Sequence, residues 1–173
     1  MDVPKAEAAA EELRELNPDI EVTWRHARVN EQNIDELLSG FDIILEGGDG
    51  PEQRLLANKF AVSREIPMVH VSAQFAYGYV FTMLDPKVDA CLHCAFPDLP
   101  SSRRGPVPVW GISTGMSGVL GANEVLKILL GHGKLARDQL LTFSNFENDL
   151  VPVPIAKNRN CPTCGSKSRI SNA

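Results

Sequence analysis

The chain has 173 residues, 43% hydrophobic and 23% charged, a composition typical of one globular domain with its own core. Its net charge of −5 argues against a nucleic-acid partner, because such proteins usually present a basic face to the phosphate backbone. No apolar run approaches the roughly 18 residues of a membrane-spanning helix. The start Met1-Asp2-Val3-Pro4 lacks the layout of a signal peptide. We therefore expect a cytoplasmic protein with no membrane partner.

The first part of the chain alternates helical and strand patterns. Helices are expected at residues 5–16, 30–38 and 51–64, and strands at residues 20–24, 41–45 and 68–71. The strand–helix–strand order implies right-handed parallel crossovers. It therefore predicts an α/β fold with a doubly wound, Rossmann-like and mostly parallel sheet.

The pattern changes at Phe75. An alternating strand is expected at 75–84, a proline-rich loop containing Arg103-Arg104 at 95–109, a glycine-bearing apolar helix at 115–130, and a hairpin at 140–155. The strands of this part are expected to be antiparallel. The chain is thus predicted to be a single domain, 1–173. Residues 1–74 would form its parallel α/β part, and residues 75–173 its antiparallel strands, Gly-rich helix and zinc-binding tail.

All four cysteines lie in two C-x-x-C knuckles. They are Cys91, Cys94, Cys161 and Cys164. In a cytoplasmic protein, two such pairs bind one tetrahedral zinc ion more often than they form disulfides. Four protein ligands close the coordination shell, so the predicted zinc site is structural. His93 lies inside the first knuckle and is expected to be a bystander, because four sulfurs are already available.

Asp49 lies in the turn Gly47-Gly48-Asp49-Gly50, just past a predicted parallel strand. Open α/β sheets bind ligands at this edge, and a carboxylate there could hold Mg²⁺ on a nucleotide phosphate. The aspartate could equally serve only the geometry of the turn. Arg54 and Asn58 follow on one face of the next helix, where they could contact a substrate or only solvate and cap the helix.

Lys5 begins the first predicted helix, where a lysine could meet a phosphate or be solvated. The chain contains no G-x-G-x-x-G fingerprint, no Walker loop and no G-x-S-x-G elbow. Residues alone therefore leave the reaction open.

The ordered series of these features resembles the ThiF/MoeB/HesA family, the bacterial relatives of E1 activating enzymes. Lys5 and Asn17-Pro18 look like the family's lysine-bearing helix and its ending, and Asp49, Arg54 and Asn58 look like its D-N-x-x-x-R-x-x-x-N stretch. The strand from Phe75, the two knuckles and the Gly-rich helix complete the series. Gly50 stands where the family has asparagine, and residues 106–110 contain no cysteine. The match begins after the family's nucleotide loop, so the chain would be an N-terminally truncated, C-terminal portion of the domain.

The resemblance implies ATP-dependent adenylylation of the C-terminal glycine of a ubiquitin-like sulfur carrier ending in Gly-Gly, as in thiamine- or molybdopterin-type sulfur transfer. Lys5 would hold phosphate oxygens, Asp49 would hold Mg²⁺ and help place the carboxylate, and Arg54 and Asn58 would support the site. The family also implies a homodimer. Because the nucleotide loop and a cysteine free of zinc are absent from this chain, a second possibility stays open. The chain could be a non-catalytic, zinc-stabilised interaction or dimerisation module that docks a carrier.

Overall fold

The computed structural model describes residues 3–99 and 105–166, and the chain divides into two units, Met1–Ser39 and Gly40–Ala173. The pair Arg103-Arg104 lies outside the described residues. The first unit contains α1 (Lys5–Leu16) and α2 (Ile34–Leu38). Helix-favouring alanines and glutamates form α1, whose bounds agree with the sequence prediction. α2 is shorter than expected, because Asn30 accepts the backbone N–H groups of Gln32 and Asn33 in a turn that precedes it.

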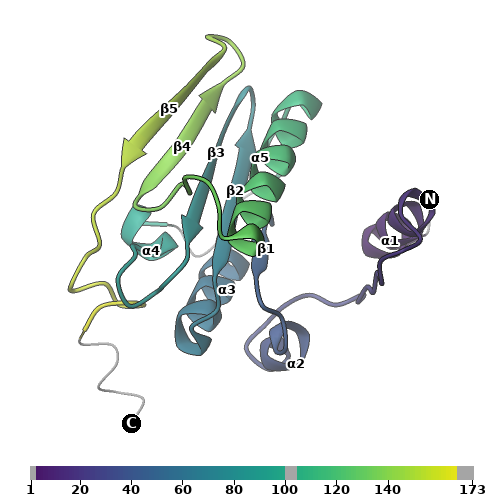
Figure 1. Ribbon diagram of the computed structural model, residues 1–173, viewed down its shortest axis with the longest axis horizontal. Coiled ribbons are helices and arrows are strands. Elements are labelled where there is room, and N and C mark those ends of the chain that lie inside the picture. Colours follow the sequence, from purple (N-terminus) through teal and green to yellow (C-terminus); the bar gives the residue numbers. More distant parts are fainter. Residues whose placement is uncertain (1–2, 100–104, 167–173) are drawn as a thin grey trace. The chain divides into compact units, whose positions relative to one another are not determined.

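The second unit is built on a five-stranded sheet in the order β1-β2-β3-β4-β5 (Figure 1). The strands are β1 (Ile44–Glu46), β2 (Met68–Gln74), β3 (Tyr77–Met83), β4 (Gln139–Ser144) and β5 (Asp149–Pro154). β1 and β2 are parallel, whereas the three later pairings are antiparallel. The change of pattern therefore falls at the tight β2–β3 connection, as the sequence predicted.

The α/β class and the antiparallel C-terminal strands are confirmed, but the sheet contains less parallel pairing than expected. The predicted strand at residues 20–24 is wrong, because this segment pairs with no other strand among the described residues. Apolar and polar residues alternate there, yet a strand also requires a neighbouring chain for its backbone hydrogen bonds. Only β1 and β2 form a parallel pair in the described sheet.

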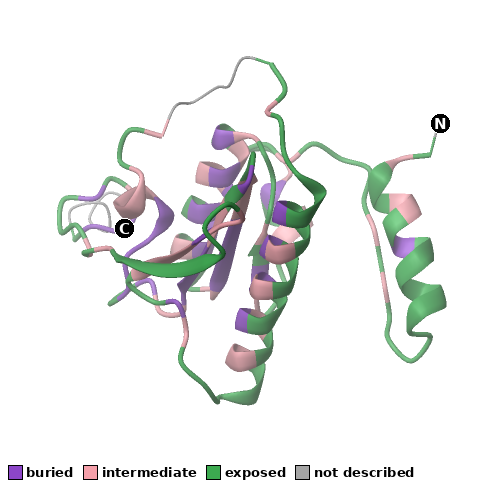
Figure 2. Ribbon diagram, turned by 90° about the horizontal axis from the view of Figure 1, so that it is seen from above, coloured by how far each residue is buried: buried purple, intermediate pink, exposed green. Residues whose placement is uncertain are grey.

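Helices α3 (Pro51–Arg64) and α5 (Gly111–Leu130) lie on opposite sides of the sheet, and the short α4 (Leu92–Ala95) carries the first knuckle (Figure 2). α3 begins with proline at its first position, as predicted. Gly121 brings α5 against β2, since a Cβ at this position would lie 2.6 Å from Val71 Cγ1. The core between them contains Val69, Val71, Val80 and Ala136. None of the described helices is long and apolar enough to cross a membrane.

Candidate functional site

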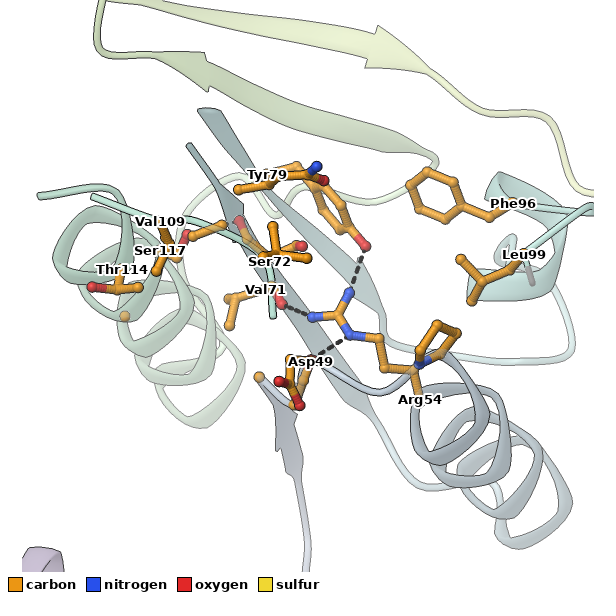
Figure 3. Close-up of a pocket in the computed structure, with 17 residues that line it drawn as sticks. Asp49, Arg54, Val71, Ser72, Tyr79, Phe96, Leu99, Val109, Thr114 and Ser117 are labelled. Carbon is orange, nitrogen blue, oxygen red and sulfur yellow. Dashed lines mark hydrogen bonds between the residues drawn. The ribbon is translucent and has the colours of Figure 1, made fainter. Parts of the chain in front are cut away.

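A cavity of about 450 Å³ opens at the carboxyl ends of β1 and β2 (Figure 3). The Gly47–Gly50 turn leaves β1 and forms one wall, and the first turns of α3 and α5 form others. The residues that line the cavity include Gly48, Asp49, Arg54, Ser72, Ser117 and, from β3, Tyr79. The structure therefore places a cavity at the sheet edge where open α/β folds bind ligands.

Arg54 is the most heavily engaged side chain of this cavity. Its Nε donates to the Gly48 carbonyl at 2.6 Å, its Nη1 to the Tyr79 hydroxyl at 2.9 Å, and its Nη2 to the Val71 carbonyl. The residue is 8% exposed. Arg54 therefore joins the turn after β1 to β2 and β3, a task that suits the fixed fork of a guanidinium group.

The sequence predicted the strand that contains Tyr79, but it did not identify Tyr79 as a residue of the cavity. Its hydroxyl accepts from Arg54, and its ring packs on Phe96 with centroids 5.3 Å apart. Burial raises the pKa of Tyr79 above its ordinary value of 10.0, so the phenol stays protonated at neutral pH.

Asp49 lines the same cavity and is exposed. Within residues 3–99 and 105–166, its carboxylate makes no hydrogen bond or ion pair. An exposed carboxylate without a partner is available to a hard cation such as Mg²⁺, which prefers oxygen ligands and keeps several waters. The structure thus brings Asp49 and Arg54 together on one cavity.

The other two predicted site residues lie elsewhere. Asn58 is fully buried and outside the cavity lining, and its Oδ1 accepts the backbone N–H of Leu92 at 3.0 Å. Lys5 is exposed at the start of α1, in the first unit. The roles predicted for both residues on the substrate stay predictions.

Two further residues near the cavity were missed from the sequence. Glu46 ends β1, and its Oε2 lies 3.4 Å from Arg54 Nε. A carboxylate at the end of a strand that the sequence predicts to be apolar was the available signal. His70 lies in the middle of β2, with Nδ1 3.2 Å from the same Glu46 oxygen, and no local pattern distinguished it from the apolar residues around it.

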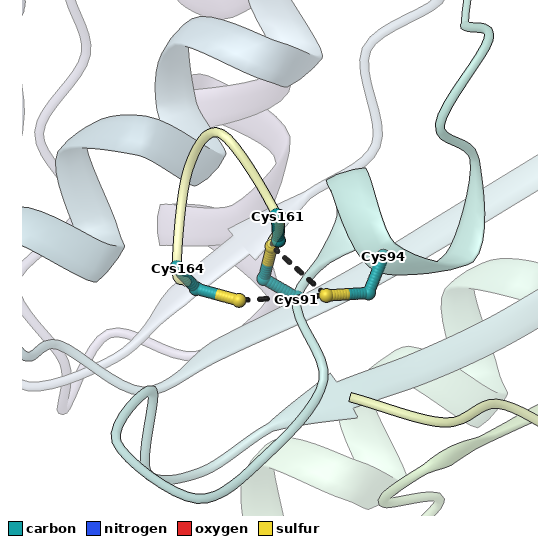
Figure 4. A group of neighbouring side chains, drawn as sticks. All are labelled: Cys91, Cys94, Cys161 and Cys164. Carbon is teal, nitrogen blue, oxygen red and sulfur yellow. Dashed lines mark hydrogen bonds between the residues drawn. The ribbon is translucent and has the colours of Figure 1, made fainter. Parts of the chain in front are cut away.

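The four cysteine sulfurs come together as predicted (Figure 4). All lie within 4.8 Å of one another, and the separations are 4.0 Å for Cys91–Cys94, 3.7 Å for Cys91–Cys161 and 3.4 Å for Cys94–Cys164. A tetrahedral zinc ion with Zn–S bonds of about 2.3 Å separates its sulfurs by about 3.8 Å. The sulfur cluster therefore fits a four-thiolate metal site.

The backbone of the knuckles also suits this chemistry. The Asn158 N–H lies 3.4 Å from Cys94 Sγ, and a Cβ at Gly165 would lie 2.5 Å from the Cys161 carbonyl oxygen. His93 is bonded through Nδ1 to Thr163 Oγ1 at 2.9 Å, so it links the two knuckles rather than joining the sulfur cluster.

Four close thiols do not ionise independently. Hydrogen bonds with Cys164 and Cys94 raise the pKa of the Cys91 thiol, whereas hydrogen bonds with Cys164 and Cys91 lower the pKa of Cys94. Like-charge repulsion keeps protons on part of the cluster until a cation is bound. Metal binding is therefore expected to release protons and to weaken in acid.

The sequence and the fold have counterparts among known proteins. The ThiF family model matches residues 1–163, and the chain belongs to this family. It is 33% identical over 168 residues to the SAMP-activating enzyme E1 of Haloferax volcanii, covering 94% of this chain and 61% of that protein. It is 31% identical over 178 residues to the sulfur carrier protein ThiS adenylyltransferase of Bacillus subtilis, covering 96% of this chain and 50% of that protein.

Solved structures confirm the fold. The crystal structure of Escherichia coli MccB with AMPCPP and selenomethionine-labelled MccA superposes with a TM-score of 0.82 over 96% of this chain and 52% of that chain, at 16% identity. MccB crystallised with ATP gives a TM-score of 0.80. The chain spans between 50% and 61% of the length of these relatives.

Proposed function

We propose that the chain is part of an enzyme that uses ATP to adenylylate the C-terminal glycine of a ubiquitin-like sulfur carrier. Its membership of the ThiF family supports this function, and two relatives named for carrier activation or adenylylation are more than 30% identical to it. The observation that carries the proposal is Asp49, a carboxylate that has no hydrogen bond or ion pair with the described residues and that lies on a cavity organised by Arg54 at the carboxyl edge of the sheet.

In this reaction a carboxylate oxygen of the carrier attacks the α-phosphorus of ATP. The bond to the bridging oxygen breaks, and pyrophosphate leaves with the electron pair. Asp49 would hold Mg²⁺, which neutralises charge on the phosphates. Arg54 would keep Gly48, and with it the Asp49 turn, at the cavity wall. Lys5 would contact phosphate oxygens. Asn58 would support the site indirectly, because its hydrogen bond to the Leu92 N–H holds α3 in place.

The zinc site would have a structural role, because four thiolates leave no open position for substrate. No cysteine outside the knuckles exists in the chain, so adenylylation would proceed without a thiol relay from this chain. We place the protein in the cytoplasm, where such thiols stay reduced and available to metal.

We also propose a homodimer formed through α5. Exposed apolar residues on this helix recur every seven residues at Ile112, Val119 and Leu126, and Leu129 lies three residues further on. The small residues Gly115 and Ala122 stand at the same three-residue offset from Ile112 and Val119. This spacing places them along one stripe, as in helices that pair. Val119 is 71% exposed although the opposite face of α5 packs on the sheet.

The direct test is ATP–pyrophosphate exchange by the complete polypeptide with a carrier ending in Gly-Gly. Asp49→Ala should lower the exchange rate by about 100-fold or more, because a magnesium ligand is lost. Asp42→Ala is the matched control, since this exposed aspartate lies before β1, at the other end of the strand. Its rate should stay within about twofold of wild type. Absence of exchange together with retained carrier binding would reject the enzyme and favour the non-catalytic docking module.

A further inference from the structure

The peptide groups of Gly48 are held from both sides by two charged residues that bracket the turn. Glu46 Oε1 accepts the Gly48 N–H at 2.7 Å, and Arg54 Nε donates to the Gly48 carbonyl at 2.6 Å. Gly48 directly precedes Asp49. The position of the Asp49 backbone is therefore set by Glu46 and Arg54 together.

The second oxygen of Glu46 completes a continuous polar cluster. Oε2 lies 3.4 Å from Arg54 Nε and 3.2 Å from His70 Nδ1, and the side chains of Glu46, Arg54 and His70 are 10%, 9% and 0% exposed. An ionised carboxylate only accepts hydrogen bonds, so the proton of His70 is assigned to Nδ1. His70 thereby fixes the rotamer of Glu46 that presents Oε1 to Gly48.

His70 holds this position at a cost to the fold. Its Nε2 is buried without a hydrogen-bond partner among the described residues, and burial lowers its pKa below the ordinary value of 6.5. A buried polar atom without a partner is destabilising and calls for an explanation beyond packing. The hydrogen bond from His70 Nδ1–H to Glu46 explains why a histidine occupies this buried position.

The turn itself explains why such a clamp is needed. Glycine at positions 47, 48 and 50 gives the backbone around Asp49 more freedom than any other residue would. Gly48 also allows the close approach of Glu46, because a Cβ there would lie 3.0 Å from Oε1. An unclamped Gly-Gly-Asp-Gly turn would leave the aspartate carboxylate in many positions.

We infer that Glu46 and His70 are positioning residues that fix Asp49 for metal and phosphate binding by clamping Gly48 against Arg54. This role rests on the proposed function for its consequence in catalysis. The hydrogen bonds that clamp Gly48 do not depend on the proposed function, because they are a property of the folded turn.

The clamp is tested first by hydrogen exchange in the folded protein. Glu46→Gln keeps the volume of the side chain, but its amide cannot accept from both Gly48 and the His70–Arg54 side. Exchange of the Gly48 N–H should accelerate about tenfold, the scale of one lost hydrogen bond. Thr82→Val is the control, since it removes the buried hydrogen bond from Thr82 on β3 to Glu124 on α5, away from the turn. Equal protection of Gly48 in wild type and Glu46→Gln would overturn the inference.

The catalytic consequence is tested by a double-mutant cycle in the exchange assay. If Glu46 acts through Asp49, Glu46→Gln should raise the Mg²⁺ concentration for half-maximal exchange about tenfold in the wild type and have no further effect in Asp49→Ala. Loss of activity by general destabilisation would instead be additive with Asp49→Ala, and would contradict the role. A wild type without exchange rejects the proposed function, whereas Gly48 protection still decides the clamp.

The role of His70 is separated by a conservative pair of variants. His70→Asn keeps an N–H near the position of Nδ1, whereas His70→Leu keeps only volume. His70→Asn should retain Gly48 protection within about twofold, and His70→Leu should lose it about as far as Glu46→Gln does. Equal behaviour of the two variants would remove His70 from the clamp.

Discussion

Asn58 Oδ1 accepts the backbone N–H of Leu92 at 3.0 Å, and this bond fastens α3 to the first cysteine knuckle. Arg54 lies one turn earlier on the same helix and contacts the cavity. A single helix thus supports the candidate active site with one residue and the candidate metal site with the other.

Asn58→Ala should lower the free energy of unfolding by about 1–3 kcal/mol, because the buried Leu92 N–H loses its partner. Urea denaturation with metal present measures the change. Lys59→Ala, at the exposed neighbouring position, is the control and should stay within about 0.5 kcal/mol of wild type. Equal stability of the two variants would mean that the bond to Leu92 contributes nothing.

The purified protein should contain one zinc ion per chain, measured by elemental analysis. Cys161→Ser should abolish stoichiometric zinc, because a serine hydroxyl doesn't replace a thiolate ligand. His93→Ala should retain it, since His93 bonds to Thr163 and not to the sulfur cluster. Zinc loss in His93→Ala equal to that in Cys161→Ser would disprove the four-thiolate assignment.

Acid should destabilise the fold partly through His70. Burial lowers the pKa of His70 from its ordinary value of 6.5, so below about pH 6.5 the unfolded chain binds a proton that the folded chain does not. The free energy of unfolding should then fall by at most about 1.4 kcal/mol per pH unit from this residue.

Urea denaturation of wild type and His70→Asn between pH 5 and pH 7.5 isolates this effect, because proton uptake by the thiol cluster is common to both proteins. The acid slope should be shallower in His70→Asn. Parallel curves would show that His70 titrates alike in the folded and unfolded states.

Arg54→Lys should be much more damaging than Tyr79→Phe. Lysine keeps the charge but cannot reach the carbonyls of Gly48 and Val71 and the Tyr79 hydroxyl as one planar fork. The expected losses in the free energy of unfolding are about 3 kcal/mol for Arg54→Lys and about 1 kcal/mol for Tyr79→Phe. Urea denaturation of both variants measures the two losses. A larger loss for Tyr79→Phe would contradict the role of Arg54 in joining the turn after β1 to β2 and β3.

Val119→Lys should convert the proposed dimer to a monomer in sedimentation velocity, because it places a charge in the apolar stripe of α5. Val88→Lys is matched in chemistry and lies outside α5, with 60% exposure. It should leave the sedimentation coefficient unchanged. A monomeric wild type would reject the dimer outright.

Local pattern was sufficient for much of the fold. The bounds of α1 and α3 agree with the sequence prediction, and the two C-x-x-C pairs predicted the sulfur cluster. Both predictions were possible because helix periodicity and cysteine spacing depend only on residues that are close in sequence. The prediction of a strand at residues 20–24 was wrong because strand formation does not depend on neighbouring residues alone. The alternation of this segment is local, but a strand exists only when a distant chain completes its hydrogen bonds.

The sequence by itself determined the family, the α/β class, the four cysteines that cluster, and the location of Asp49 and Arg54 near one strand edge. Only the tertiary structure decided that Asn58 faces the knuckle, and that Glu46 and His70 join the Gly48 clamp. Glu46 meets His70, and Asn58 meets Leu92, across long stretches of chain. Such contacts form only when separate elements pack against each other. The spacing of residues along one element therefore does not predict them.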